Sequence, residues 1–201
     1  SPDRRRSDLF AYRLRPATMS RHHVETVFPE LAELSDDDLR DGVADAWATA
    51  MADTGVTDLR TVPWFPPAMA DLGIEDETLV DHVRDVTATA VALAETLVER
   101  RDADLSLDTV LAGALVHDVS KLYEFDGMDR TPVGDLLGHP YYGVHVVARA
   151  GLPVELAHVV LSHTARTSVD PATLEAEVVR RVDEVAAAAI RSSAAQDGRP
   201  G

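Results

Sequence analysis

Hydrophobic positions recur every three or four residues along most of the chain, which is the spacing of an amphipathic α-helix. This pattern predicts helices at about residues 35–53, 75–101, 107–123, 140–150, 153–165 and 171–193. No stretch alternates between apolar and polar residues for long enough to predict a β-strand. The pattern therefore predicts an all-α protein, a compact single-domain bundle of about six main helices with short connections.

Three segments depart from this pattern. Residues 1–34 are predicted to be an N-terminal extension that is partly disordered, because residues 1–20 are polar and irregular, and residues 194–201 are predicted to be a flexible tail. The stretch 61–69, which contains the proline-rich segment 63–67, cannot be the interior of a helix, so it is predicted to be an ordered connection anchored by Trp64 and Phe65. The helical domain is therefore expected to span residues 35–193.

Composition and charge narrow the function classes. The 201 residues are 45% hydrophobic, enough for one core, and their net charge of -16 disfavours duplex nucleic acid and anionic membranes as partners. No apolar run approaches the roughly 20 residues of a membrane helix, and no signal peptide is recognisable, so a cytoplasmic location is expected. The chain has no cysteine, which excludes thiol nucleophiles and cysteine-bound metals.

Several ionisable residues fall on the apolar faces of the predicted helices. One buried histidine is readily explained by a hydrogen bond to a backbone carbonyl, but this chain has a larger set: His82, His117, Asp118, His163 and Asp183. An unpaired charge in an apolar environment costs several kcal/mol. These groups must therefore satisfy one another or share a cation.

Imidazole and carboxylate groups without a thiolate suit manganese, iron, cobalt, nickel or zinc, and the core of a helical bundle is a usual place for such a site. His117 and Asp118 are adjacent, so their side chains are expected to approach one metal from neighbouring directions. The second oxygen of Asp118 can then reach another metal. Asp118 is thus the expected bridging ligand.

In this order, His82, the His117-Asp118 pair and Asp183 resemble the signature of the HD-domain superfamily. His139, in the pattern H-x-x-x-G, and His163 match two further positions of the members that hold two metals. The resemblance implies one metal on His82, His117, Asp118 and Asp183. It implies a second metal on Asp118, His139 and His163.

Lys121 is the only lysine and completes the motif H-D-x-x-K, three residues beyond Asp118. Its ammonium is expected either to meet a phosphoryl oxygen or to pair with Asp118 and orient it. Arg130, Arg149 and Arg166 lie in segments that flank the predicted ligands, and each is a candidate for gripping an anionic substrate.

The resemblance implies a metal-dependent phosphohydrolase that cleaves a small phosphomonoester or phosphodiester, nucleotides included. The nucleophile would be a metal-bound hydroxide at a site of one or two ions, with Asp118 and Lys121 as catalytic residues. One alternative is an HD-type di-iron oxygenase acting on a small polyol or phosphonate. Another is a catalytically silent, metal-stabilised module that binds a nucleotide or a protein.

Overall fold

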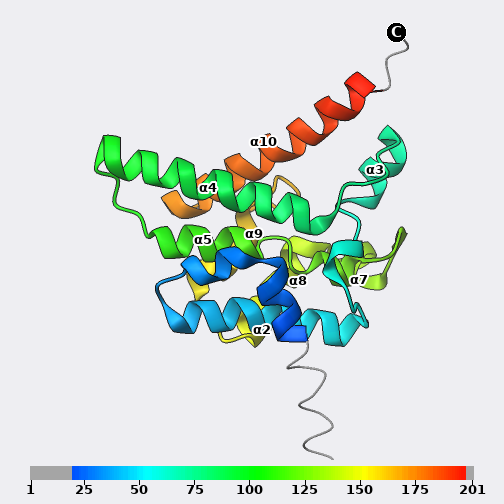
Figure 1. Cartoon of the computed structure of the whole chain (residues 1–201), viewed down its shortest axis with the longest axis horizontal. Helices are drawn as coiled ribbons and strands as arrows, with labels where there is room; N and C mark the ends of the chain where they lie inside the picture. Colours follow the sequence, from blue (N-terminus) through cyan, green and yellow to red (C-terminus); the bar gives the residue numbers. More distant parts are fainter. Residues whose placement is uncertain (1–19, 198–201) are drawn as a thin grey trace, which may run out of the picture.

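The computed structural model describes residues 20–197, and side chains through residue 195. The described part is helical apart from a two-residue antiparallel ladder, so the prediction of an all-α fold is confirmed (Figure 1). The α-helices are α2 (Asp37–Thr54), α3 (Pro66–Leu72), α4 (Leu79–Arg101), α5 (Leu107–Val116), α6 (Lys121–Glu124), α7 (Pro132–Leu136), α8 (His139–Arg149), α9 (Val154–Ser162) and α10 (Leu174–Asp197). The short elements are the 3-10 helices η1 (Pro29–Glu33) and η2 (Leu59–Thr61) and the strands β1 (Phe125–Asp126) and β2 (Asp129–Arg130).

Helix α5 lies at the centre of the bundle. It contacts α2, α4, α9 and α10, and every residue from Val110 to Val116 is buried. In Figure 1, α2 lies on one side of α5 while α4 and α10 lie on the other. A helix that is apolar on all sides must be covered on all sides, and this burial fixes the position of whatever follows its C-terminal end.

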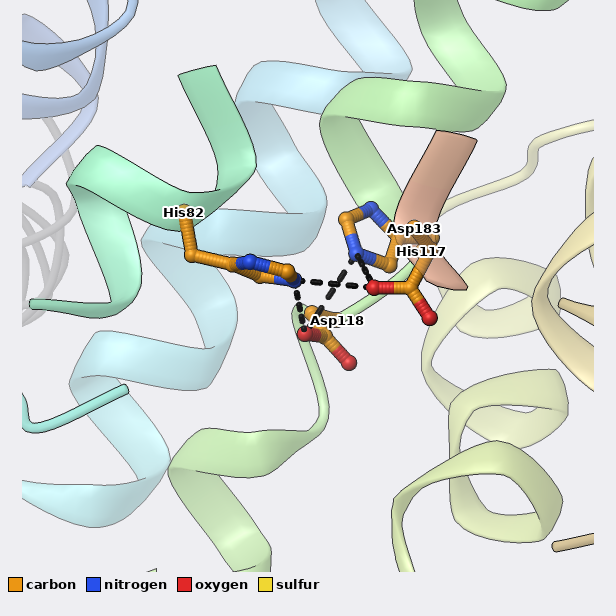
Figure 2. A group of neighbouring side chains, drawn as sticks. All are labelled: His82, His117, Asp118 and Asp183. Carbon is orange, nitrogen blue, oxygen red and sulfur yellow. Dashed lines mark hydrogen bonds and ion pairs between the residues drawn. The ribbon is translucent and has the colours of Figure 1, made fainter. Parts of the chain in front are cut away.

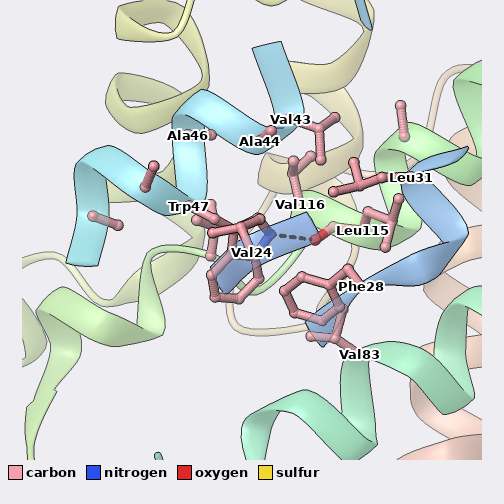
Figure 3. Packing of buried hydrophobic residues seen from close by; sticks show 14 of the residues in the cluster. Val24, Phe28, Leu31, Val43, Ala44, Ala46, Trp47, Val83, Leu115 and Val116 are labelled. Atoms are coloured by element: carbon pink, nitrogen blue, oxygen red, sulfur yellow. Dashed lines mark hydrogen bonds between the residues drawn. The ribbon is translucent and has the colours of Figure 1, made fainter. Parts of the chain in front are cut away.

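The chain before residue 35 belongs to the same core. Residues 20–27 are helical and η1 follows, and the buried side chains of this segment are Val24, Val27, Phe28, Leu31 and Leu34. Phe28 packs on Trp47 with ring centroids 5.0 Å apart (Figure 3). The second half of the predicted N-terminal extension is therefore structured, because its apolar residues face α2 and α5. The expected disorder of residues 1–20 falls almost entirely outside the described residues.

At the other end of the chain, α10 continues through residues 194–197, which had been assigned to the tail. The helix begins at Leu174, later than predicted, and Thr173 accepts a hydrogen bond from the backbone N–H of Ala176 at its first turn. The alanine-rich sequence favours helix without requiring packing partners. The remaining tail residues, 198–201, lie outside the described part.

The predicted helix over residues 107–123 is interrupted at its most informative point. Helix α5 ends at Val116, a turn covers residues 117–120, and α6 starts at Lys121. The last carbonyl groups of a helix lack partners within it. Here the ring Nδ1 of His117 donates to the carbonyl of Ala114 at 2.7 Å, and the indole of Trp47 donates to that of Leu115 at 2.9 Å (Figure 3). The expectation that His117 and Asp118 lie within a helix is thus wrong. Helix α5 ends before them because buried side chains form hydrogen bonds to its last carbonyl groups.

Residues 62–65 are an ordered connection, as predicted, but residues 66–69 of the predicted connection form the start of α3. Pro66 and Pro67 occupy the first turn of that helix, where a missing N–H is harmless. The backbone N–H of Trp64 donates to the carbonyl of Glu77, and that of Leu79 donates to Val62. These bonds attach the segment to the start of α4.

Helices α8 and α9 approach each other closely at Gly143. A Cβ at this position would lie 2.4 Å from Val160 Cγ1 and 3.0 Å from Ser120 Oγ, so a larger residue does not fit. The Ser120 hydroxyl donates to the backbone carbonyl of His139 at 2.6 Å. The glycine of the H-x-x-x-G pattern therefore allows α8 to pack where it presents His139.

Candidate metal centre

Five segments far apart in the sequence bring the predicted ligands together. His82 lies in the first turn of α4 and Asp183 in the first half of α10. His117 and Asp118 lie in the turn after α5, His139 is the first residue of α8, and His163 follows α9. The six side chains form two groups that share Asp118. Their role as metal ligands stays a prediction, while their convergence is a feature of the structure.

The two histidines that follow helices are oriented by the same device. His163 Nδ1 donates to the carbonyl of Val160 at 2.6 Å, as His117 Nδ1 does to Ala114. In each case the acceptor is three residues earlier, in the last turn of the helix that the histidine ends. Because Nδ1 carries the proton, Nε2 is left with a lone pair that can bind a cation.

The first group contains His82, His117, Asp118 and Asp183 (Figure 2). His82 Nε2 lies 2.9 Å from Asp183 Oδ1 and 3.5 Å from Asp118 Oδ2. His117 Nε2 lies 3.3 Å from Asp118 Oδ2 and 3.8 Å from Asp183 Oδ1. Two imidazole nitrogens and two carboxylate oxygens therefore face one small volume.

The second group contains Asp118, His139 and His163. Its nitrogens face the other carboxylate oxygen of Asp118, with His139 Nε2 at 3.3 Å and His163 Nε2 at 3.6 Å from Oδ1. The two histidine Nε2 atoms lie 3.3 Å apart. Asp118 thus presents Oδ2 to one group and Oδ1 to the other, which is the geometry of a bridging carboxylate.

Among the described residues, five buried side-chain atoms have no hydrogen-bond partner, including Trp64 Nε1 and His82 Nδ1. Two others, His117 Nε2 and Asp118 Oδ1, face the first and the second group respectively. Buried polar atoms in proteins are nearly always hydrogen-bonded. The unused lone pairs of His117 Nε2, in the first group, and of Asp118 Oδ1, in the second group, therefore need an explanation. A divalent cation in each group supplies one, and the donor set of nitrogen and oxygen suits such ions.

Burial and neighbouring charges set the protonation of these groups. Burial lowers the pKa of His82, and it lowers the pKa of His139 to about 4. Burial disfavours the Asp183 carboxylate, but the hydrogen bond from His82 together with the charges of His117 and His163 lowers its pKa to about 2. Near neutral pH these imidazoles are uncharged and this carboxylate is ionised, as metal binding requires.

The same opposition operates at His117 and Asp118. Burial disfavours ionised Asp118, yet the Lys121 ammonium and His117 hold its pKa well below the usual range. Burial also disfavours protonated His117, but the Asp118 carboxylate raises its pKa. A raised pKa at an otherwise unpartnered Nε2 indicates an environment that attracts positive charge.

Glu124, which the sequence analysis did not select, lies behind His139. Its side chain is fully buried, and Oε2 accepts a hydrogen bond from His139 Nδ1 at 2.7 Å. Arg166 Nη2 donates to Oε1 at 2.8 Å. Burial opposes ionised Glu124, but His139 and Arg166 lower its pKa. This carboxylate fixes the proton of His139 on Nδ1 and leaves Nε2 free. An acid between Tyr123 and Phe125 was the only sign of its burial in the sequence.

Lys121 forms the ion pair that was one of its two predicted roles. Its ammonium lies 2.7 Å from Asp118 Oδ2, and its side chain is 8% exposed. It also lies 5.8 Å from the ring centre of Trp64 and 5.6 Å from that of Phe65. The proline-rich segment therefore covers the site from the side of α4 and α10.

A cavity of about 90 Å³ opens beside the two groups. Trp64, Phe65, Lys121, Arg166 and Arg191 line it, together with four of the predicted ligands and the small residues Thr164 and Ala187. Of the arginines proposed from sequence, Arg166 lines this cavity and Arg130 reaches within 3.8 Å of Glu124. Arg149 instead pairs with Asp53, and neither Arg130 nor Arg149 lines the cavity.

The fold and the two groups define a helical protein with paired histidine and aspartate sites suited to divalent cations. The chain belongs to the HD-domain family, whose model matches residues 79–188. The resemblance predicted from the motifs is thereby confirmed. All six predicted ligands lie within the matched residues.

One curated relative is the dihydroneopterin 2',3'-cyclic phosphate phosphodiesterase of Methanocaldococcus jannaschii, which is 31% identical over 112 residues. The alignment covers 53% of this chain and 45% of the relative, so the matched part spans less than half of that protein. No solved structure gives a significant match. Among the described residues, no helix combines the length and apolar character needed to cross a bilayer.

Proposed function

We propose that this protein is a metal-dependent phosphohydrolase that cleaves a small phosphate ester. The observation that carries the proposal is the position of Asp118, whose two oxygens face two separate groups of histidine nitrogens. His82, His117, Asp118 and Asp183 would hold one ion, and Asp118, His139 and His163 the other. Two divalent ions at such a site supply Lewis acidity toward a phosphoryl oxygen and lower the pKa of water.

The side chains around the groups have complementary tasks. Lys121 holds Asp118 by its ion pair and places a positive charge at the cavity, where negative charge develops on the phosphoryl oxygens. Glu124 keeps His139 in the tautomer that leaves Nε2 unprotonated. Trp64 and Phe65 cover the site and restrict water around these charges.

Similarity to the archaeal relative favours a phosphodiester over a monoester. That protein is named for a 2',3'-cyclic phosphodiester. A cyclic phosphodiester is compact enough for its phosphoryl group to enter the cavity described above. We therefore propose a small phosphodiester, cyclic nucleotides included, as the first substrate class to examine.

The test combines metal analysis with an assay on the same purified sample. The protein is expected to contain manganese, iron, cobalt, nickel or zinc, at up to two ions per chain, and to cleave bis(4-nitrophenyl) phosphate or a 2',3'-cyclic nucleotide. Asp118→Asn should lose both metal and turnover, because it weakens a ligand shared by both groups. The control Asp135→Asn changes an exposed acid and should retain both.

Two results would contradict the proposal. Full metal content and turnover in Asp118→Asn would remove the central ligand from the scheme. An iron-loaded protein that consumes oxygen and leaves phosphate esters intact would indicate an oxygenase instead.

A further inference from the structure

The cavity beside the two groups is too small to enclose a whole substrate. Its volume is about 90 Å³, whereas pockets that enclose a small-molecule ligand usually measure roughly 300–1,000 Å³. A phosphoryl group can enter, but the remainder of a phosphate ester must lie at the mouth. The side chains at the mouth therefore contact the part of the substrate that is not cleaved.

Three cationic side chains line this cavity, and two of them have carboxylate partners. Lys121 pairs with Asp118, and Arg166 pairs with Glu124. Among the described side chains, residues 20–195, no carboxylate pairs with the third, Arg191. In a chain with a net charge of -16, a cation without an acidic partner beside a candidate site is unusual.

No acidic residue lies within four positions of Arg191 on α10. The positions three and four residues before and after it are all alanine, namely 187, 188, 194 and 195, so Arg191 cannot form an ion pair at either of these helical spacings. On the same helix, Arg181 pairs with Glu177 at 2.8 Å and with Glu184 at 2.9 Å. The two arginines therefore differ in the acids that α10 places around them.

The same face of α10 connects Arg191 with the metal centre. Asp183, Ala187 and Arg191 follow at intervals of four residues, and all three line the cavity. The Arg191 guanidinium lies 5.7 Å from the ring centre of Trp64, which also lines the cavity, and this contact supports the position of the cation. Ala187, between them, leaves open space at the cavity wall.

We propose that Arg191 binds a second anionic group of the substrate, one that is not cleaved, so that the preferred substrates are small phosphate esters with a further anionic group. This inference rests on the proposed function, because it takes the scissile phosphoryl group to lie at the two metal groups. Lys121 and Arg166 are neutralised by their partners, which leaves Arg191 as the cation available for additional charge. Arg191 is thus a substrate-binding residue that determines specificity.

The test compares two ligands that differ by one carboxylate. Phenylphosphonate and 4-carboxyphenylphosphonate, which have no P–O–C bond to cleave, are titrated into the manganese-loaded, full-length protein by isothermal calorimetry. The wild type should bind the carboxylated compound more tightly. Arg191→Ala should weaken its binding about fivefold, as for a partly exposed ion pair, and change the binding of phenylphosphonate less than about twofold. Arg191→Lys should keep part of the preference.

The control variant is Arg181→Ala, which removes an arginine from the same helix outside the cavity and should leave both affinities unchanged. Equal weakening of both ligands by Arg191→Ala, or no weakening, overturns the inference, as does a wild type that binds neither compound. The titration measures no turnover. Failure of the proposed hydrolase function would instead appear as absence of cleavage by a metal-loaded protein that still distinguishes the two ligands.

Discussion

At the scale of the residue, His117 and His163 each perform two tasks with one ring. Nδ1 satisfies a carbonyl at the end of a helix, and Nε2 points to the centre of the site. The simplest explanation for a buried histidine, a hydrogen bond to a backbone carbonyl, therefore applies to both residues. It does not compete with a ligand role, because in neutral imidazole one nitrogen donates a hydrogen bond while the other keeps a lone pair.

Lys121 allows the charge at the cavity to be changed without changing a predicted ligand. Lys121→Met should retain metal and reduce kcat about 100-fold, because the ammonium no longer stabilises the charge that develops during phosphoester cleavage. Steady-state kinetics and elemental analysis of the same sample measure the two effects. Lys121→Arg keeps the charge with a different geometry and should recover part of the rate. Unchanged kinetics in Lys121→Met would leave only the structural ion pair with Asp118.

Glu124 allows a selective test of the second group. Glu124→Gln keeps the size of the side chain but weakens the acceptor for His139 and leaves Arg166 without its carboxylate. The affinity of the second group for metal should fall about 10- to 100-fold, while the first group is retained. Elemental analysis after dialysis should therefore give a lower ratio of metal to protein.

The matched control for Glu124 is Asp135→Asn, which changes an exposed acid near Arg130. It should leave the metal ratio unchanged. Circular dichroism separates loss of metal from loss of fold. A fully metal-loaded Glu124→Gln variant after dialysis would show that His139 does not depend on this carboxylate.

At the scale of the element, the end of α5 decides the geometry of the site. A continuous helix through residue 123 would separate neighbouring side chains by a fixed rotation of about 100°. In the turn at 117–120, His117 keeps helical backbone angles, but the backbone bonds tighten from Val119 N to Val116 O and from Lys121 N to Asp118 O, and His117 and Asp118 face the same centre. Hydrophobic periodicity does not reveal this break, because the residues on both sides of it are buried in either case.

Asp108 connects the start of α5 to the start of α2. Its carboxylate accepts hydrogen bonds from Ser35 N at 3.2 Å, from Ser35 Oγ at 2.5 Å and from Asp36 N at 3.0 Å. The bonds from Ser35 lower its pKa. A depressed pKa in the folded state contributes stability above the ordinary carboxyl range, and this contribution is lost as the pH falls through the folded-state pKa.

Asp108→Ala should therefore lower Tm by about 2 °C at pH 7, and the difference from the wild type should shrink below about pH 4. Differential scanning calorimetry across this range measures both. The control Asp104→Ala removes an exposed acid from the loop between α4 and α5. A difference that stays constant with pH would show that the charge of Asp108 contributes nothing.

At the scale of the whole molecule, an acidic surface encloses a centre that attracts cations. The net charge of -16 disfavours long polyanions, whereas Lys121, Arg166 and Arg191 offer local positive charge to a small anion. The site also joins the bundle together, since its predicted ligands come from α4, α8, α10 and the residues that follow α5 and α9. Metal binding should therefore stabilise the entire fold.

Removal of metal tests this link. At a free-metal concentration about 100 times Kd, binding contributes about 2.7 kcal/mol, so chelation should lower Tm by roughly 5–10 °C. Thermal unfolding with and without a chelator, followed by readdition of manganese, measures the effect. Asp118→Asn should respond little to either treatment. A Tm that does not change although elemental analysis shows that metal has been removed would contradict a structural contribution of the site.

The helical class, the six predicted ligands and the likeness to the HD-domain family could all be predicted from the amino-acid sequence alone. These follow from local periodicity, from ionisable residues on apolar faces and from the order of the motif. Three features could be found only in the three-dimensional fold: the end of α5, the inclusion of residues 20–34 in the core, and the positions of Glu124 and Arg191 beside the site. Each of these depends on groups distant in sequence, such as Trp47 with Leu115 or Glu124 with Arg166, and local patterns carry no information on such contacts.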